Sequence, residues 1–165
     1  MSLFPDDIEA QARRIIETLS KRKLMVSTAE SCTGGLIAGA LTEIAGSSAV
    51  VDRGFVTYTN DAKMDMLGVP SSVLATHGAV SRETALLMAT GALFRSRAGL
   101  AVAVTGIAGP GGGSVDKPVG LVHLAACSRD GTILHRAMRY GDTGRKEIRL
   151  ATIRTALEML LDAAD

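Results

Sequence analysis

Several residue types that often indicate a function are scarce in this chain of 165 residues. It contains no Trp, and aromatic residues make up 3% of it. Few flat side chains are therefore available for bases to stack on, which argues against binding of single-stranded nucleic acid. The formal net charge is only +1, with Lys and Arg scattered along the chain. The basic run at residues 21–23 ends an expected helix, where the dipole favours cations, so we interpret it as a solvated helix end rather than a DNA-binding patch.

Cysteine and histidine are too few to form the common disulfide or metal patterns. Cys32 and Cys127 lie far apart and make no Cys-x-x-Cys unit, which argues against a disulfide framework and a structural zinc site. The three histidines show no His-x-x-x-His spacing, and His123 and His135 fall in apolar runs that are typical of strands. We therefore expect ordinary strand histidines, no metal and no cofactor.

Long apolar runs are absent as well. No stretch approaches the length of a membrane span, and residues 1–17 contain acids and arginines without the apolar core of a signal peptide. We therefore expect a cytoplasmic protein that does not bind membranes. Apolar residues make up 47% of the chain and charged residues 21%, as in globular proteins. The length suits one domain over residues 1–165, with a core of Ala, Val, Leu, Ile and Met.

Helical and strand-like apolar patterns alternate along the chain. The patterns predict helices at residues 5–23, 33–44 and 61–67, a fourth that starts near Ser81, and a fifth after Gly144. They predict strands at residues 24–29, 50–59, 100–104, 119–127 and 132–140. The fully apolar run at 100–104 suits a central strand, and the turn pair Asp130-Gly131 predicts that the last two strands are antiparallel. The fold class is therefore α/β, a single three-layer α/β/α sandwich with a mixed sheet.

Four segments with chemically useful residues fall at the ends of expected strands. They are the turn at Ser31, residues 58–63, residues 105–113 and residues 141–149. Ligands of open α/β sheets bind at strand ends, so we expect these segments to meet there.

The first segment is the string AESCTGG at residues 29–35, which joins an expected strand to an expected helix. It sets the hydroxyl of Ser31 at a sharp turn, where backbone N–H groups lack helical partners and the helix dipole adds partial positive charge. The same N–H groups can hold the oxyanion that forms when a serine attacks an acyl carbon. Taken alone, the string also fits an ordinary helix cap, with Ser31 or Thr33 as the capping residue.

The second segment is TYTNDAK at residues 57–63, which starts a short helix that Asn60 can cap. Lys63 lies in the first turn of this helix, where the dipole disfavours a cation. A partly buried lysine in that position has its neutral form favoured, and a neutral amine can activate a serine without histidine. Tyr58 can then orient the lysine or relay its proton. The alternative is a surface lysine paired with a neighbouring aspartate.

The third segment is VTGIAGPGGG at residues 104–113, the first part of a glycine-rich loop over residues 106–118. Glycines let backbone N–H groups approach an anion closely, so a phosphate-bearing ligand fits this loop. The Gly-Lys-Ser/Thr end of a Walker A loop is missing, and the spacing is not Gly-x-Gly-x-x-Gly. The alternative is a merely flexible loop.

The fourth segment begins the last expected helix, where Arg145 is followed by Lys146 and Arg149. A cation at a helix N-terminus again opposes the dipole, which makes sense where Arg145 faces a ligand phosphate. A solvated helix face is the alternative interpretation.

The four segments occur together with further short strings in a fixed order. The strings are AESCTGG at 29–35, TYTNDAK at 57–63 with LGV at 67–69, VTGIAGP at 104–110 with GG at 112–113 and KPVG at 117–120, and GR at 144–145 with IR at 148–149. In this combination the chain resembles the CinA C-terminal domain family, the nicotinamide-nucleotide amidases also called PncC. The similarity spans roughly residues 8–162.

The resemblance implies an enzyme that hydrolyses the carboxamide of nicotinamide mononucleotide to nicotinate mononucleotide and ammonia, a step of NAD recycling. It implies Ser31 as the nucleophile, Lys63 as its base, and Tyr58 as an orienting or relaying hydroxyl. The residues expected to bind the substrate or its oxyanion are Cys32, Thr33, Gly34, Thr105, Gly106, Gly109, Gly111, Gly112 and Arg145, the last at the substrate phosphate.

The resemblance also bears on partners and on further activities. Family members often carry an N-terminal domain similar to molybdopterin-binding proteins and linked with ADP-ribose pyrophosphatase activity; this chain has no such segment, so we expect no pyrophosphatase activity. A pyridine nucleotide is the expected small-molecule partner, and a homo-oligomer, a dimer or larger, is the expected assembly. The alternative function is a non-catalytic nucleotide-binding module of the same fold, which needs no reactive lysine.

Overall fold

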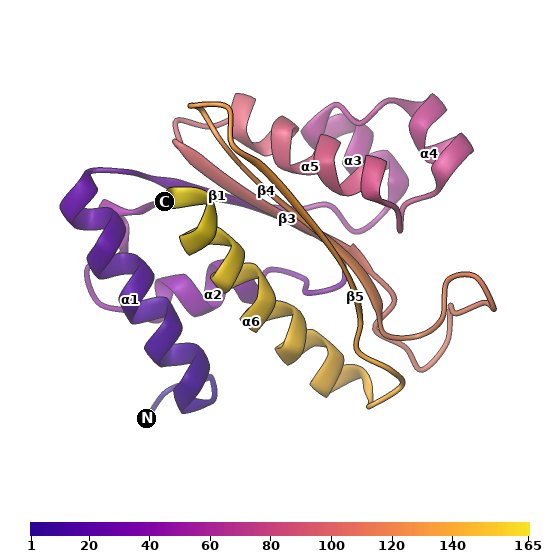
Figure 1. Cartoon of the computed structure of the whole chain (residues 1–165), viewed down its shortest axis with the longest axis horizontal. Helices are drawn as coiled ribbons and strands as arrows, with labels where there is room; N and C mark the ends of the chain where they lie inside the picture. Colours follow the sequence, from indigo (N-terminus) through magenta and orange to yellow (C-terminus); the bar gives the residue numbers. More distant parts are fainter.

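A five-stranded mixed sheet separates two layers of helices in the computed structural model, which describes residues 1–165 (Figure 1). The strands are β1 (Val26–Glu30), β2 (Val51–Val56), β3 (Leu100–Gly106), β4 (Leu121–Ser128) and β5 (Ile133–Arg139). Their order in the sheet is β2-β1-β3-β4-β5. Strand β1 runs parallel to β2 and β3, whereas β4 is antiparallel to both β3 and β5. The predicted three-layer fold, the central position of residues 100–104 and the antiparallel hairpin are confirmed.

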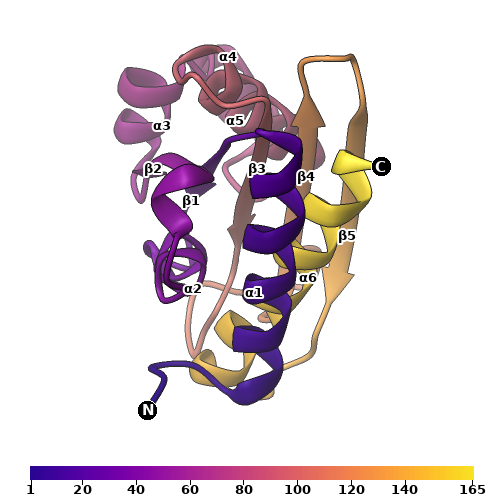
Figure 2. The same cartoon turned by 90° about the vertical axis from the view of Figure 1, so that its left-hand side faces the viewer.

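The helices divide between the two faces of the sheet, as Figures 1 and 2 show. The helices are α1 (Asp6–Arg22), α2 (Leu36–Thr42), α3 (Asn60–Leu67), α4 (Ser71–His77), α5 (Arg82–Phe94) and α6 (Arg145–Ala164), with a short 3-10 helix at Ser47–Ala49. Helices α1, α2 and α6 cover one face, and α3, α4 and α5 cover the other. The parallel strands therefore end between two helical layers, and their carboxyl ends are reached from the loops that lead into α2, α3 and α6.

Alternate residues of β3 face the two layers, as the pleat of a strand requires. Leu100, Val102 and Val104 join the core under α1 and α6, whereas Ala101 and Ala103 join the core under α5. The second layer packs tightly because its residues are small. At Gly91 of α5 an added Cβ would lie 2.1 Å from the carbonyl oxygen of Leu67, so only glycine lets α5 approach α3 this closely.

Several element boundaries differ from the sequence-based prediction. The helix expected at residues 33–44 is α2 over Leu36–Thr42, preceded by a turn. Helix α3 begins at Asn60 and is capped by Thr59, whose Oγ1 accepts the N–H of Ala62 at 3.0 Å, so the prediction of Asn60 as the cap was wrong. Helix α4 was not predicted, because its seven residues lie between turn-forming residues and carry only a short apolar pattern.

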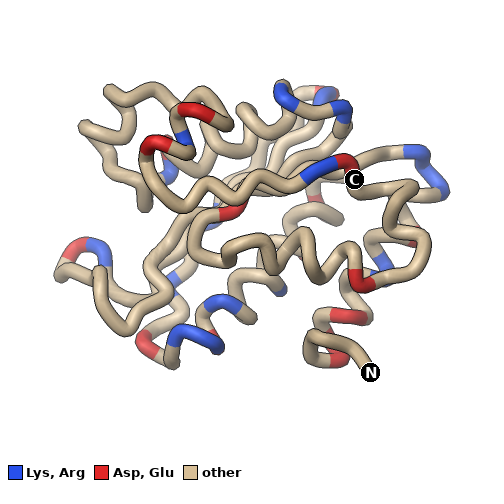
Figure 3. Tube along the Cα trace, turned by 180° about the vertical axis from the view of Figure 1, so that it is seen from behind, with Lys and Arg blue, Asp and Glu red and all other residues tan.

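Charged residues of both signs are interspersed over the trace (Figure 3). None of the helices combines the length and the apolar character needed to cross a membrane.

Candidate active site

The four predicted segments converge where the parallel strands end. Ser31 follows β1, Lys63 lies in α3 after β2, Thr105 lies near the end of β3, and Arg145 begins α6. They line a cavity of about 270 Å³. Its predicted residues are Ser31, Cys32, Tyr58, Lys63, Thr105, Gly106, Gly109, Gly111, Gly112 and Arg145. Of the residues predicted for binding, Thr33 and Gly34 do not line this cavity.

Lys63 lines the cavity but is almost completely buried, with 1% of its surface exposed. Its Nζ lies 3.1 Å from Ser31 Oγ, 2.8 Å from the carbonyl oxygen of Thr57 and 3.3 Å from that of Tyr58. No carboxylate forms an ion pair with it. Because burial removes water from an amine that has no counter-ion, the pKa of Lys63 is lowered from its usual 10.5. The alternative of a surface lysine paired with an aspartate is therefore wrong.

The three oxygen atoms around Lys63 Nζ can form hydrogen bonds with either the neutral amine or the ammonium. A neutral amine has two N–H donors for the two carbonyl oxygens and one lone pair that can accept the hydroxyl proton of Ser31. An ammonium has three donors for the same three oxygens. A proton can therefore pass from Ser31 to Lys63 without any rearrangement of these partners.

Residues 31–35 form what we call the nucleophile turn, and neighbouring strands fix its start. The N–H of Ser31 donates to the carbonyl oxygen of Val104 in β3 at 3.1 Å. The N–H of Gly34 donates to the carbonyl oxygen of Ser31 at 3.0 Å. By contrast, the N–H groups of Cys32 and Thr33 donate to no other residue. Of these two residues only Cys32 lines the cavity, and a free N–H in that position is suited to hold an oxyanion.

Glu30 fixes the turn from within the core, a role that the sequence analysis missed. Its carboxylate is 1% exposed and accepts the hydroxyl of Thr33 at 2.6 Å and the N–H groups of Ile37 and Ala38 at 2.8 and 3.0 Å. It therefore caps α2 from seven residues away. An acid in the segment that leads from a strand into a helix was the available signal, because carboxylates are favoured near helix N-termini.

Tyr58 contacts two residues of the cavity through different groups. Its backbone carbonyl contacts Lys63, but its hydroxyl accepts a hydrogen bond from Arg145 Nη2 at 3.0 Å and makes none with the lysine. The side chain is 58% exposed, because the loop after β2 turns the carbonyl inward and the ring outward. The Tyr58 hydroxyl makes no direct hydrogen bond with Lys63, and its role as an orienting or relaying hydroxyl stays a prediction.

The glycine-rich loop forms the opposite wall of the cavity. The N–H groups of Ala108, Gly109, Gly111 and Gly112 donate to no other residue. Arg145 Nη1 donates to the carbonyl oxygen of Gly109 at 2.7 Å, so the arginine holds this loop in place. The wall therefore offers several backbone donors to a ligand.

Thr105 lines the cavity, but its hydroxyl proton is already used. Oγ1 donates to the carbonyl oxygen of Ala79 at 2.8 Å, which ties the end of β3 to the loop before α5. Only the lone pairs of this hydroxyl remain for a ligand.

Cys32 is buried beside Ser31 and is a poor nucleophile. Burial raises the pKa of its thiol to about 11, so the reactive thiolate is scarce at neutral pH. No group of three or more His, Cys, Asp or Glu side chains is arranged to hold a metal ion. His123 and His135 lie in strands, as predicted, and stack on each other away from the cavity.

Comparison with known proteins identifies the family of this chain. The model of the CinA C-terminal domain matches residues 8–164. A CinA-like protein from Syntrophus aciditrophicus is 47% identical over 159 residues, which cover 96% of this chain and 37% of the relative. The chain spans only 30–38% of the length of the first curated relatives that it matches.

Solved structures agree with this assignment. The competence/damage inducible protein CihA from Agrobacterium tumefaciens is 75% identical, with a TM-score of 0.99 and complete coverage of both chains. A competence-damaged protein (CinA) superfamily protein from Escherichia coli is 35% identical, with a TM-score of 0.89 over 96% of this chain and 92% of its own. The chain therefore belongs to the CinA C-terminal domain family.

Proposed function

We propose that this chain is a metal-independent amidase that hydrolyses the carboxamide of nicotinamide mononucleotide through Ser31 and Lys63. The proposal is carried by one observation: the Nζ of a buried lysine without a counter-ion lies 3.1 Å from Ser31 Oγ in a cavity. A serine needs a base to become a nucleophile, and an amine with a lowered pKa is suited to that task near neutral pH. The substrate is the one that the motifs of the family imply.

In the first half of the proposed reaction, neutral Lys63 takes the hydroxyl proton of Ser31 as Oγ attacks the carboxamide carbon. The negative charge that develops on the amide oxygen is held by the free N–H of Cys32, which lines the cavity beside Ser31. The Lys63 ammonium then returns its proton to the leaving nitrogen. The C–N bond breaks, ammonia leaves, and an ester to Ser31 remains.

In the second half, Lys63 takes a proton from a water molecule, which attacks the ester carbon. The bond to Ser31 breaks, the ammonium returns a proton to Oγ, and a carboxylic acid is released. One amide and one water give one acid and one ammonia, and the enzyme returns to its starting state. No redox partner is needed at any step.

The surroundings of the cavity support a nucleotide as the substrate. A cavity of about 270 Å³ suits a single aromatic carboxamide, and an open groove of about 640 Å³ adjoins it along Gly111 and Gly112. This groove leaves room for a ribose phosphate. Arg145 and the free N–H groups of the glycine-rich loop are suited to an anion at the border between the two.

Ammonia release from three substrates tests the proposal. Purified protein should release ammonia from nicotinamide mononucleotide faster than from its riboside or from free nicotinamide, because only the nucleotide carries the phosphate. Mass spectrometry should find nicotinate mononucleotide in equal amount. Tight binding of the nucleotide with no product after prolonged incubation would instead favour the non-catalytic binding module.

A further inference from the structure

Arg149 lies behind the nucleophile turn and donates hydrogen bonds to two of its carbonyl oxygens. It is the fifth residue of α6. Its Nε lies 3.1 Å from the carbonyl oxygen of Cys32, and its Nη2 lies 3.2 Å from that of Thr33. Two donors of one planar guanidinium therefore hold two successive peptide groups. Arg149 does not line the cavity, unlike its neighbour Arg145.

Because of the geometry of the peptide bond, these two hydrogen bonds also fix the direction of the N–H groups on the same peptides. In a trans peptide the C=O and the following N–H point in opposite directions. Holding the carbonyl of Cys32 therefore aims the N–H of Thr33 away from Arg149. Holding the carbonyl of Thr33 aims the N–H of Gly34, which donates to the carbonyl oxygen of Ser31 and closes the turn.

We propose that Arg149 is a positioning residue that keeps the nucleophile turn in the form of an oxyanion hole, with the N–H of Cys32, which lines the cavity, as the donor. This inference rests on the proposed attack by Ser31. The positive charge of the guanidinium beside the two carbonyl oxygens also polarises their peptide groups, which strengthens the N–H donors at the other end of those groups. Without the guanidinium, the Cys32 carbonyl loses its hydrogen bond and the Thr33 carbonyl loses one of two, so the Gly34 N–H is held less firmly on the Ser31 carbonyl and the Cys32 donor is placed less exactly.

The carbonyl oxygen of Thr33 also accepts the N–H of Leu36 at 3.1 Å, but that of Cys32 is held by Arg149 alone. Glu30 binds the hydroxyl of Thr33 and the N–H groups of Ile37 and Ala38, but it touches no carbonyl of the turn. A role of Arg149 as a ligand of the substrate phosphate does not fit, because its Nε and Nη2 are used by the turn and the side chain lies outside the cavity.

The test compares Arg149→Met with Arg154→Met, and it uses a probe that does not depend on the natural substrate. Arg154 lies on the same helix but pairs with Asp7 at the surface, so it is a matched control. An alkyl fluorophosphonate reacts with Ser31 by displacement of fluoride, and its phosphoryl oxygen occupies the oxyanion position. The rate of adduct formation at Ser31 is followed by mass spectrometry, together with ammonia release from nicotinamide mononucleotide.

We expect Arg149→Met to slow both reactions by about 10- to 100-fold, somewhat less than the loss of a whole oxyanion donor. The loss should fall on kcat rather than KM, and the pH midpoint should stay that of the wild type because Lys63 is untouched. Added guanidinium ion should restore part of the rate. Arg154→Met should react like the wild type.

Adduct formation at the wild-type rate in Arg149→Met would overturn the inference, and so would a loss confined to KM. If the methionine variant does not fold, Arg149→Lys gives the same test, because a lysine keeps the charge but cannot hold both carbonyls. A wild-type protein that forms the Ser31 adduct but leaves the nucleotide intact would refute the proposed substrate alone. The effect of Arg149 on the adduct would still decide the inference.

Discussion

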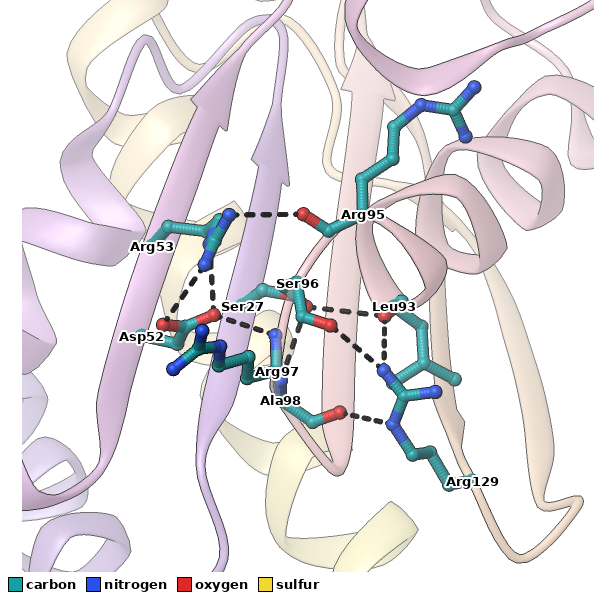
Figure 4. Close-up of polar contacts among 9 residues, drawn as sticks. All are labelled: Ser27, Asp52, Arg53, Leu93, Arg95, Ser96, Arg97, Ala98 and Arg129. Atoms are coloured by element: carbon teal, nitrogen blue, oxygen red, sulfur yellow. Dashed lines mark hydrogen bonds and ion pairs between the residues drawn. The ribbon is translucent and has the colours of Figure 1, made fainter.

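The two ends of the parallel strands use their polar groups in opposite ways. At the amino ends, Arg129 donates to the carbonyl oxygens of Leu93, Ser96 and Ala98 (Figure 4). Asp52 accepts the N–H of Arg97 at the same end. At the carboxyl ends, a buried lysine has no counter-ion, and backbone N–H groups of two loops have no acceptor.

This difference separates stability from function within one sheet. Polar groups that lose water without gaining a partner lower the free energy of unfolding, so a fold has no reason to keep them unless a ligand uses them. At the amino ends Arg129 and Asp52 bind backbone groups of the segment that joins α5 to β3. The carboxyl ends remain unsaturated, and in open α/β sheets this is where ligands bind.

Removal of the nucleophile should give the largest effect. We expect Ser31→Ala to lower kcat for ammonia release by about 10⁴-fold, the order seen when one member of a catalytic unit is lost. Ser96→Ala is the matched control at the other end, where the hydroxyl bonds to Ser27 and to the backbone. It should lower stability slightly and leave kcat unchanged. A Ser31→Ala variant that turns over at the wild-type rate would remove serine from the mechanism.

Removal of the base should come next. We expect Lys63→Met to lower kcat by about 10²- to 10⁴-fold, the usual contribution of a general base. In the wild type the rate should rise with pH as Lys63 loses its proton, because its pKa is lowered by burial. This rise should be absent from the residual activity of the variant. An unchanged pH profile would assign the base to another group.

A substitution at the amino ends of the parallel strands should lower the free energy of unfolding and leave the rate unchanged. Arg129→Met removes a donor from three carbonyl oxygens, of which that of Leu93 still accepts the Ser96 hydroxyl. Each unsatisfied buried group costs about 1–3 kcal/mol, and water reaches part of this site. We therefore expect the free energy of unfolding to fall by about 1 kcal/mol in total. Urea denaturation measures this loss, and kcat of the folded variant should equal that of the wild type. A drop in kcat would mean that the two ends are coupled.

The smallest effect is expected at Cys32. Its thiol stays protonated at neutral pH because burial raises its pKa to about 11. Cys32→Ala should therefore keep most of the ammonia release. Loss of activity comparable to that of Ser31→Ala would contradict the assignment of the nucleophile.

Local patterns predicted the layers and the sheet, although they missed α4. The apolar run at residues 100–104 and the Asp130-Gly131 turn depend on neighbours in the sequence, and both lie where predicted. The convergence of four strand ends followed from topology alone. The unfavourable place of Lys63 at a helix start was a local signal too, and its contact with Ser31 fits that signal.

Contacts between distant residues were beyond the reach of the sequence. The residues joined by the hydrogen bonds from Arg149 to Cys32 and Thr33 are 117 and 116 positions apart in the sequence. Those joined by the bond from Arg145 to Tyr58 are 87 positions apart. They depend on how α6 packs against the sheet, and no local pattern records that packing. The roles that we assign to these residues in catalysis remain predictions.

The central claim is that burial favours the neutral form of Lys63, which can then accept the hydroxyl proton of Ser31. An NMR titration of isotope-labelled lysine side chains, with Lys63→Met to identify the signal, tests it most directly. The account predicts one lysine that titrates clearly below the usual 10.5 and is missing from the variant spectrum. A Lys63 signal that titrates together with the surface lysines would contradict it.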